Sequence, residues 1–163
     1  MIIIGIDPGT ATTGYGVIKK VKSRKTRTKN SELKCLDYGI IQTDPSLSTE
    51  ERLRKLHNSV SKLLNNYKPE VLVTERLYFF KNLKTAIPVA QAQGVILLAA
   101  ARKKIQLEEF TPLEVKMGIC GYGRADKTQI QRMIKEILNL KEIPKPDDAA
   151  DALAIAVCWA VKK

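Results

Sequence analysis

Unbroken runs of apolar residues alternate along this chain with stretches in which the apolar positions recur every three or four residues. Short apolar runs rich in β-branched residues are typical of strands buried on both faces of a sheet. The longer periodic stretches are typical of amphipathic helices. We therefore predict strands over 2–6, 14–19, 35–43, 71–75 and 105–110. We predict helices after Ser48 up to Lys68, from about 86 to 103, a short one containing Lys116, one capped by Asp126, and one over 147–161.

Polar residues and prolines mark the starts of several of these helices. Ser48 is followed three residues later by Glu51, which is the spacing of a capping box. Thr111-Pro112-Leu113-Glu114 combines an N-cap residue, a proline at the first helical position and an acid at the third. Pro88 is predicted to lie in the first turn of its helix, where its missing N–H costs little.

The order of the elements indicates an α/β fold. Three strands come first, and helices then alternate with the last two strands. An initial meander followed by such alternation is typical of a five-stranded mixed sheet with helices on both faces. The length of 163 residues, without a repeat or a linker, favours a single domain over 1–163. The polar stretch 19–34 between the second and third strands is predicted to be a basic hairpin loop.

The chain is strongly basic, with 28 Lys and Arg residues against 17 Asp and Glu residues and a net charge of +11. Most of this excess is concentrated in 19–34, which holds eight basic residues and one acid. A charge of this kind favours a polyanionic partner, nucleic acid in the first place and an anionic membrane surface in the second. We expect the basic side chains of this loop to bind one arm of the nucleic acid.

Several classes of protein are excluded by the sequence. The longest apolar run, 94–101, is far shorter than the roughly 18 residues that span a bilayer. The first residues lack the basic region of a secretory signal. Cys35, Cys120 and Cys158 are odd in number and far apart, which fits neither a disulfide framework nor a zinc site. We therefore expect a cytoplasmic protein with no membrane partner.

Four acidic residues stand where the fold alone does not need them. Asp7 and Glu75 each end a buried strand, and the carboxyl ends of strands are where open α/β sheets bind ligands. Asp148 and Asp151 lie three residues apart in the first turn of an apolar helix. Carboxylates that repel each other and lose hydration are stabilised when they bind a cation. A site made of oxygen ligands alone suits Mg²⁺ or Mn²⁺.

Two alternatives stay open from the residues alone. Acids at the start of a helix also complement its dipole, and we interpret Asp147 in this way. The spacing does not choose between the pairs Asp147–Asp151 and Asp148–Asp151, because residues three and four apart both face each other on a helix.

Several motifs, which follow one another in collinear order over essentially the whole chain, resemble those of a known family. The motifs are Gly5-Ile6-Asp7-Pro8-Gly9-Thr10, Thr13-Gly14-Tyr15-Gly16-Val17, Glu75 with Phe80-Lys81-Asn82, Ala90-Gln91-Ala92-Gln93-Gly94, Val115-Lys116, Ala125-Asp126-Lys127-Thr128-Gln129 and Asp148-Ala149-Ala150-Asp151-Ala152-Leu153-Ala154. In this combination the chain resembles the RuvC-type Holliday junction resolvases.

The resemblance implies a ribonuclease-H-like fold and a homodimer that acts in homologous recombination and DNA repair. Such an enzyme resolves four-way junction DNA by paired, symmetric nicking of two strands of like polarity. It uses Mg²⁺, with Mn²⁺ as a substitute, and leaves ligatable 5′-phosphate and 3′-hydroxyl ends. A RuvA-RuvB-type branch-migration complex is the further partner that the resemblance implies.

The resemblance also implies roles for individual residues. The catalytic acids and metal ligands are Asp7, Glu75, Asp148 and Asp151, four carboxylates that can hold two divalent ions about 4 Å apart. The DNA-binding residues are Lys116 and Lys127 beside the cut site, Lys81, and the junction-probing aromatics Tyr78 and Phe79, which Phe80 adjoins.

The chain departs from the family pattern at two positions. Tyr78 stands where Phe is frequent, which leaves open which of the neighbouring rings probes the junction. Trp159 stands where many members carry His, and we interpret it as a packing residue.

Three other classes of protein are alternatives to the interpretation as a RuvC-type resolvase. A YqgF-type ribonuclease-H-like nuclease shares the opening turn after Asp7. An actin-like or sugar-kinase ATPase also begins with an acid in a glycine turn, but it needs two lobes and gives the terminal Asp-x-x-Asp no role. A non-enzymatic nucleic-acid-binding protein would need the charge alone and none of the four acids.

Overall fold

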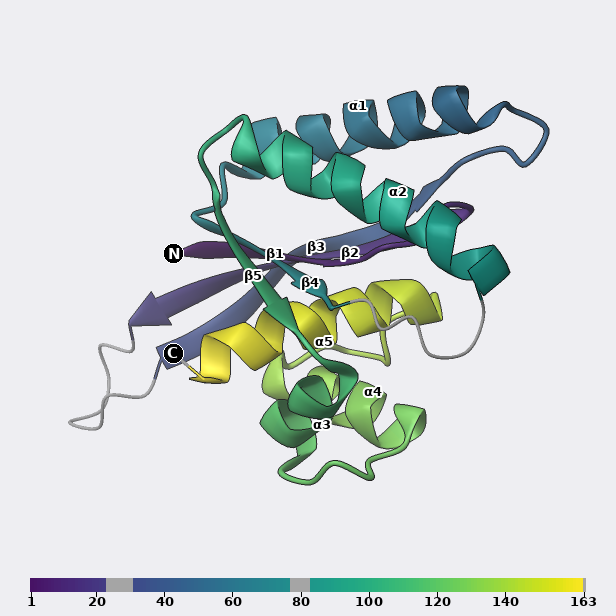
Figure 1. Cartoon of the computed structure of the whole chain (residues 1–163). Coiled ribbons are helices and arrows are strands. Elements are labelled where there is room, and N and C mark those ends of the chain that lie inside the picture. The colour runs from purple at the N-terminus through teal and green to yellow at the C-terminus, as the bar shows by residue number, and fades with distance from the viewer. Residues whose placement is uncertain (23–30, 77–82, 163) are drawn as a thin grey trace.

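The computed structural model of the chain describes residues 1–22, 31–76 and 83–162, around a central five-stranded sheet (Figure 1). The strand order is β3-β2-β1-β4-β5. The strands β1 (Ile2–Asp7), β2 (Thr12–Lys22) and β3 (Ser31–Gln42) pair antiparallel, whereas β4 (Val71–Glu75) runs parallel to β1 and to β5 (Gln106–Phe110). The mixed five-stranded sheet predicted from the sequence is confirmed.

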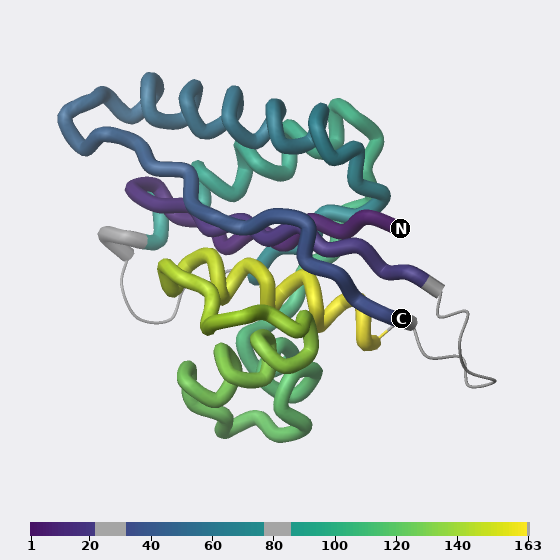
Figure 2. The backbone as a smooth tube through the Cα atoms, turned by 180° about the vertical axis from the view of Figure 1, so that it is seen from behind, coloured from purple at the N-terminus to yellow at the C-terminus, as the bar shows by residue number. Residues whose placement is uncertain are grey.

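Helices cover both faces of this sheet, as predicted. The helices α1 (Thr49–Tyr67) and α2 (Leu83–Ala101) lie on one face, and α5 (Asp147–Lys162) lies on the other (Figure 1). The helices α3 (Pro112–Cys120) and α4 (Lys127–Ile137) form a further layer on the outer side of α5, which Figure 2 shows from behind. Within the residues that the structure describes, no helix is long and apolar enough to cross a membrane.

The central strands divide their apolar side chains between two cores, because successive residues of a strand point to opposite faces. Ile4 and Leu72 pack with α1 and α2, whereas Ile3 and Val73 pack with α5. Trp159 is only 4% exposed in the core on the α5 side, which agrees with its interpretation as a packing residue. Each face of the sheet therefore has its own apolar core beneath helices.

The helix α5 lies unusually close to β1 and β2, because small residues face each other there. A Cβ atom at Gly5 would collide with the carbonyl oxygen of Ala152, and one at Gly14 would collide with that of Asp148. Gly14 is the cross-strand partner of Asp7. The glycines therefore allow the first turn of α5 to lie directly against the end of β1.

Two of the predicted boundaries are wrong. The strands β2 and β3 continue as far as the Lys22–Ser31 pair, so much of 19–34 is paired strand rather than loop, and 23–30 lie outside the described residues. β3 is an edge strand, where polar side chains can face solvent without breaking the ladder. The helix α2 starts at Leu83 and not near 86, which places Pro88 inside it. The helix tolerates this proline, because the proline removes only one backbone hydrogen bond near the helix start.

The predicted starts of α1, α3 and α4 are confirmed. The Glu114 N–H donates to Thr111 Oγ1 across 3.1 Å, and the Thr111 N–H donates to Glu114 Oε2 across 2.9 Å. The Gln129 N–H donates in the same way to Asp126 Oδ1 across 2.8 Å, and α1 begins directly after Ser48. The first turns of α3 and α4, the helices that carry the two lysines of the candidate site, are thereby defined by local hydrogen bonds.

Candidate active site

The four acids meet at one edge of the sheet. Asp7 and Glu75 end the neighbouring parallel strands β1 and β4, whose register pairs Ile6 with Thr74. Asp148 and Asp151 come from the first turns of α5, which the glycines of β1 and β2 allow to lie against this edge. The structure thus brings together four carboxylates from three segments that are far apart in the sequence.

Burial and the negative charges of neighbouring acids disfavour the charged forms of Asp7, Glu75 and Asp151. Burial, followed by the negative charges of the other three acids, raises the pKa of Asp7 to about 7. Burial and then the charge of Asp151 raise the pKa of Glu75. Burial also raises the pKa of Asp151, although Lys127 acts in the opposite direction. A cation bound among the four carboxylates would relieve this repulsion.

The donor set fits a hard divalent cation, because it consists of carboxylate oxygens alone. Among the residues that the structure describes, however, no three acidic, histidine or cysteine side chains are already arranged to hold a metal ion. Asp151 is instead paired with Lys127, whose Nζ lies 3.0 Å from its Oδ2. The residues therefore fit a metal site whose ligands must still close around the ion.

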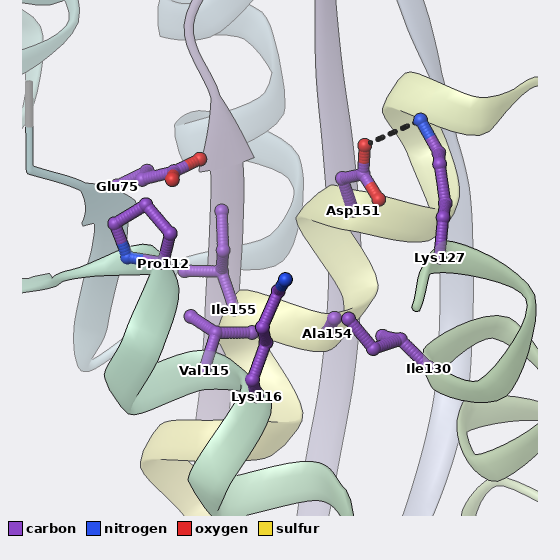
Figure 3. A pocket seen from close by; sticks show the side chains of 9 residues that line it. All are labelled: Glu75, Pro112, Val115, Lys116, Lys127, Ile130, Asp151, Ala154 and Ile155. Carbon is purple, nitrogen blue, oxygen red and sulfur yellow. Dashed lines mark ion pairs between the residues drawn. The ribbon is translucent and has the colours of Figure 1, made fainter. Parts of the chain in front are cut away.

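A hollow of about 220 Å³ opens beside the acids (Figure 3). Glu75 and Asp151 lie on opposite sides of it, and the ammonium of Lys116 points from α3 toward the space between them. Lys127, at the start of α4, lines the same hollow. Its floor is apolar and is made by Pro112, Val115, Ile130, Ala154 and Ile155. The hollow therefore presents acids and lysines together above an apolar floor.

The structure distinguishes Asp147 from Asp148, which spacing along the helix had left as equal candidates to pair with Asp151. The charge of Asp148 contributes to the raised pKa of Asp7, and Asp148 also lines a second hollow against the turn that follows β1. The side chain of Asp147 is 65% exposed and is held by Lys127 and Gln131 instead. Asp148 therefore belongs to the acidic cluster, and Asp147 lies at its rim.

Four of the residues singled out in the sequence cannot be placed. Tyr78, Phe79, Phe80 and Lys81 lie outside the described residues. Lys116 and Lys127, the other two cationic residues of the prediction, both line the hollow beside the acids.

Gln93 is a residue of the site whose role the sequence did not reveal. It is only 7% exposed, and its Nε2 donates both to the backbone oxygen of Glu75 across 3.2 Å and to Glu109 Oε1 across 2.9 Å. Glu109 also lies near Arg76, the residue after Glu75, with 3.9 Å between Arg76 Nε and Glu109 Oε2. The signal in the sequence was that Gln91 and Gln93 are the two polar side chains in the otherwise apolar stretch 86–101, of which the structure buries Gln93.

Fold and site together define a class of protein. A mixed sheet with antiparallel β1–β3, acids at the ends of β1 and β4, and an acidic first turn of a buried helix are the features of a ribonuclease-H-like nuclease. Comparisons with known proteins give the family. Residues 3–159 match the model of the family described as crossover junction endodeoxyribonuclease RuvC. The chain belongs to this RuvC family, whose members are metal-dependent endonucleases.

Individual relatives agree with this assignment. The crossover junction endodeoxyribonuclease RuvC of Fusobacterium nucleatum is 52% identical over 157 residues, which make up 96% of this chain and 78% of that protein. The structure of Thermus thermophilus RuvC matches with a TM-score of 0.88 and 32% identity, over 99% of this chain and 94% of the other. The same protein in complex with a Holliday junction substrate matches with a TM-score of 0.86 and 29% identity, over the same shares of the two chains.

Proposed function

We propose that this chain, as a Holliday junction resolvase, uses Asp7, Glu75, Asp148 and Asp151 to hydrolyse one phosphodiester bond in each of two DNA strands of like polarity. The observation that carries the assignment is the convergence of the four acids at one sheet edge, where burial and mutual repulsion raise the pKa of Asp7 to about 7. The products would be 5′-phosphate and 3′-hydroxyl ends that a ligase can rejoin.

The four carboxylates would hold two divalent ions, Mg²⁺ or Mn²⁺. Such ions, when bound, supply an activated water and neutralise charge on the scissile phosphate. Asp7 is central to the ligand set, because the charges of all three other acids act on it. Glu75 and Asp151 lie beside the apolar floor of the hollow, and an apolar surrounding strengthens electrostatic interactions.

Lys116 and Lys127 would supply positive charge to the reacting phosphate. Both line the hollow, and Lys116 points toward the space between Glu75 and Asp151 (Figure 3). An ammonium group held there can stabilise the charge that develops on the phosphate oxygens in the transition state. No side chain has to act as the nucleophile, which agrees with a sequence that has one histidine and three widely spaced cysteines.

Junction binding would involve Lys81, Tyr78 and Phe79 together with the basic stretch 19–34, which is called the basic segment between β2 and β3 below. Cationic side chains contact phosphates without reading sequence, and aromatic rings can stack on an unpaired base. The Thermus thermophilus relative in complex with a Holliday junction substrate supports a junction as the ligand.

A homodimer would present two equivalent sites to the two equivalent strands of a junction. The helix α2 offers a surface for it, since Ile87 and Leu98 are 62% and 54% exposed on the face opposite to the buried Ala92 and Ile96. Gly94 lies between the exposed pair with open space around it, so a second helix could approach closely.

A branch-migration complex of the RuvA-RuvB type would deliver the junction to this protein. We place both in the cytoplasm, where the free thiols of all three cysteines are stable.

The test is the cleavage of a synthetic mobile four-way junction in Mg²⁺. We expect paired, symmetric nicks from the wild-type protein and no nicks from Asp7→Asn, which should still bind the junction. Asp44→Asn, the same substitution at an exposed residue outside the site, is the control and should cleave normally. Cleavage by Asp7→Asn at the wild-type rate would overturn the assignment of the acids. A preference for RNA–DNA hybrids over junctions would instead favour the YqgF-type alternative.

A further inference from the structure

Lys127 is shared between two carboxylates of different environments. Its Nζ lies 3.0 Å from Asp151 Oδ2 and 3.3 Å from Asp147 Oδ2. Asp147 and Asp151 lie four residues apart on α5, so their side chains are neighbours on one face of that helix. The ammonium therefore already contacts both of them, and it can move from one to the other without moving the backbone.

The Asp147 carboxylate is itself oriented by α4. Gln131 Nε2 donates to Asp147 Oδ1 across 3.0 Å, which leaves Oδ2 for Lys127. Gln131 and Lys127 are four residues apart, so a matching pair of side chains on α4 faces the acidic pair on α5. The side chain of Asp147 is 65% exposed and that of Asp151 is 35% exposed, so Asp147 is the outer of the two positions.

A divalent cation bound to Asp151 would repel an ammonium group held on the same carboxylate, because like charges a few ångströms apart repel each other. If Asp151 is a metal ligand, the bound cation weakens the pairing of Asp151 with Lys127. A lysine with no second carboxylate would lose its ion pair in that step and would compete with the metal. A lysine with a carboxylate already in contact loses much less.

We propose that Asp147 is a positioning residue for Lys127: it holds the ammonium when a cation takes Asp151, and Gln131 orients it for this role. The inference rests on the proposed metal site. It assigns a purpose to an acid that helix-dipole arguments would treat as generic. It also keeps the lysine charge at the rim of the hollow, within reach of a bound phosphate.

The experiment is a double-mutant cycle on Mn²⁺ affinity, measured by electron paramagnetic resonance on the full chain without DNA. We expect Asp147→Asn to weaken Mn²⁺ binding by about fivefold, the size of coupling that contacting charged groups show. Lys127→Met should strengthen binding. In the Lys127→Met background, Asp147→Asn should change the affinity by less than about twofold, because no lysine remains to be held.

Two controls separate the possible causes. Glu142→Gln removes one negative charge from an exposed residue shortly before α5 and should leave the affinity nearly unchanged. Gln131→Met should weaken Mn²⁺ binding in the direction of Asp147→Asn but by less. An equal loss from Asp147→Asn in both backgrounds would mean that the acid acts only through its charge, and would overturn the proposal.

The proposed metal site is tested in the same titration. Asp151→Asn should bind Mn²⁺ much more weakly than the wild-type protein does. If it binds equally well, the metal site and the role of Asp147 both fall. If Asp151→Asn loses binding but the cycle shows no coupling between Asp147 and Lys127, the metal site stands and only the role of Asp147 is overturned.

Discussion

The side-chain amide of Gln93 donates a hydrogen bond to the backbone oxygen of Glu75 across 3.2 Å. The same amide nitrogen donates to Glu109 Oε1, so α2 is tied to the ends of both β4 and β5. Glu75 is the last residue of its strand, and the strand ladder holds it on one side only. Gln93 therefore restricts the backbone from which the Glu75 carboxylate projects into the hollow.

Gln93→Met, which keeps the volume and removes the hydrogen bonds, should slow single-turnover junction cleavage by about 10–100-fold, as supporting partners of metal ligands commonly do. Junction binding should stay unchanged, since Gln93 is buried. The loss of a buried donor should also cost about 1–3 kcal/mol of stability, measured by urea unfolding. Gln42→Met, at an exposed position at the end of β3, should change neither quantity.

A charge-swapped pair separates the effect of Gln93 on Glu75 from its effect on stability. In Gln93→Glu with Glu109→Gln, the two side chains can still bond to each other, but the Glu75 oxygen has no donor. We expect unfolding stability to recover partly while cleavage stays slow. Full recovery of the cleavage rate would show that Gln93 acts only as a structural link between α2 and β5.

Cation binding should depend on pH through Asp7. Its pKa of about 7 means that it is largely protonated at pH 6 and largely ionised at pH 8 in the metal-free protein. A cation must displace that proton, so Mn²⁺ affinity should fall by up to about tenfold for each pH unit below 7. A titration series from pH 5.5 to 8.5 measures this. Asp7→Asn should bind more weakly and without this dependence, and an identical pH profile would contradict the assignment.

The same shift has the opposite effect on the stability of the metal-free protein. The pKa of Asp7 rises from an ordinary value of 3.8 to about 7 on folding, so protonation favours the folded state. This contribution is complete below the unfolded value and is lost as the pH rises through 7, at a cost on the order of 4 kcal/mol. Thermal unfolding in a chelator should therefore show wild type losing stability relative to Asp7→Asn between pH 4 and 8. Parallel profiles would be evidence against the shift.

Lys116 should matter more for chemistry than for binding, because it points into the hollow between the acids (Figure 3). Lys116→Ala should slow single-turnover cleavage by about 100-fold and weaken junction binding by less than about threefold. Lys141→Ala, at an exposed lysine outside the hollow, is the matched control and should leave the rate unchanged. Equal losses of rate and affinity would make Lys116 a simple phosphate contact.

The basic segment between β2 and β3 should control the salt dependence of binding. Each phosphate contact adds about 0.9 to the slope of log affinity against log salt concentration, so Arg24→Gln with Lys25→Gln should lower the slope by up to about 2. The rate at saturating protein should not change. The control pair is Arg54→Gln with Lys55→Gln on α1, which removes the same charge from exposed positions. If both pairs have the same effect, the segment has no special role in binding.

Much of the fold could be predicted from short-range patterns, because these depend on neighbours along the chain. The strand over 71–75 and the starts of α3 and α4 follow from apolar runs and capping residues, and the structure has them at the predicted places. The positions of Asp7 and Glu75 at strand ends were likewise visible in the sequence. The extent of β2 and β3 was not, since pairing across an edge strand depends on the partner strand more than on local propensity.

The sequence by itself determined which residues carry charge and the order of the strands and helices. Only the tertiary structure decided which of these residues meet. Spacing along α5 treats Asp147 and Asp148 alike, but the approach of α5 to Gly5 and Gly14 places Asp148 with Asp7 and leaves Asp147 to Lys127 and Gln131. The physical reason is that such contacts depend on close packing between elements far apart in the chain, which no local pattern encodes.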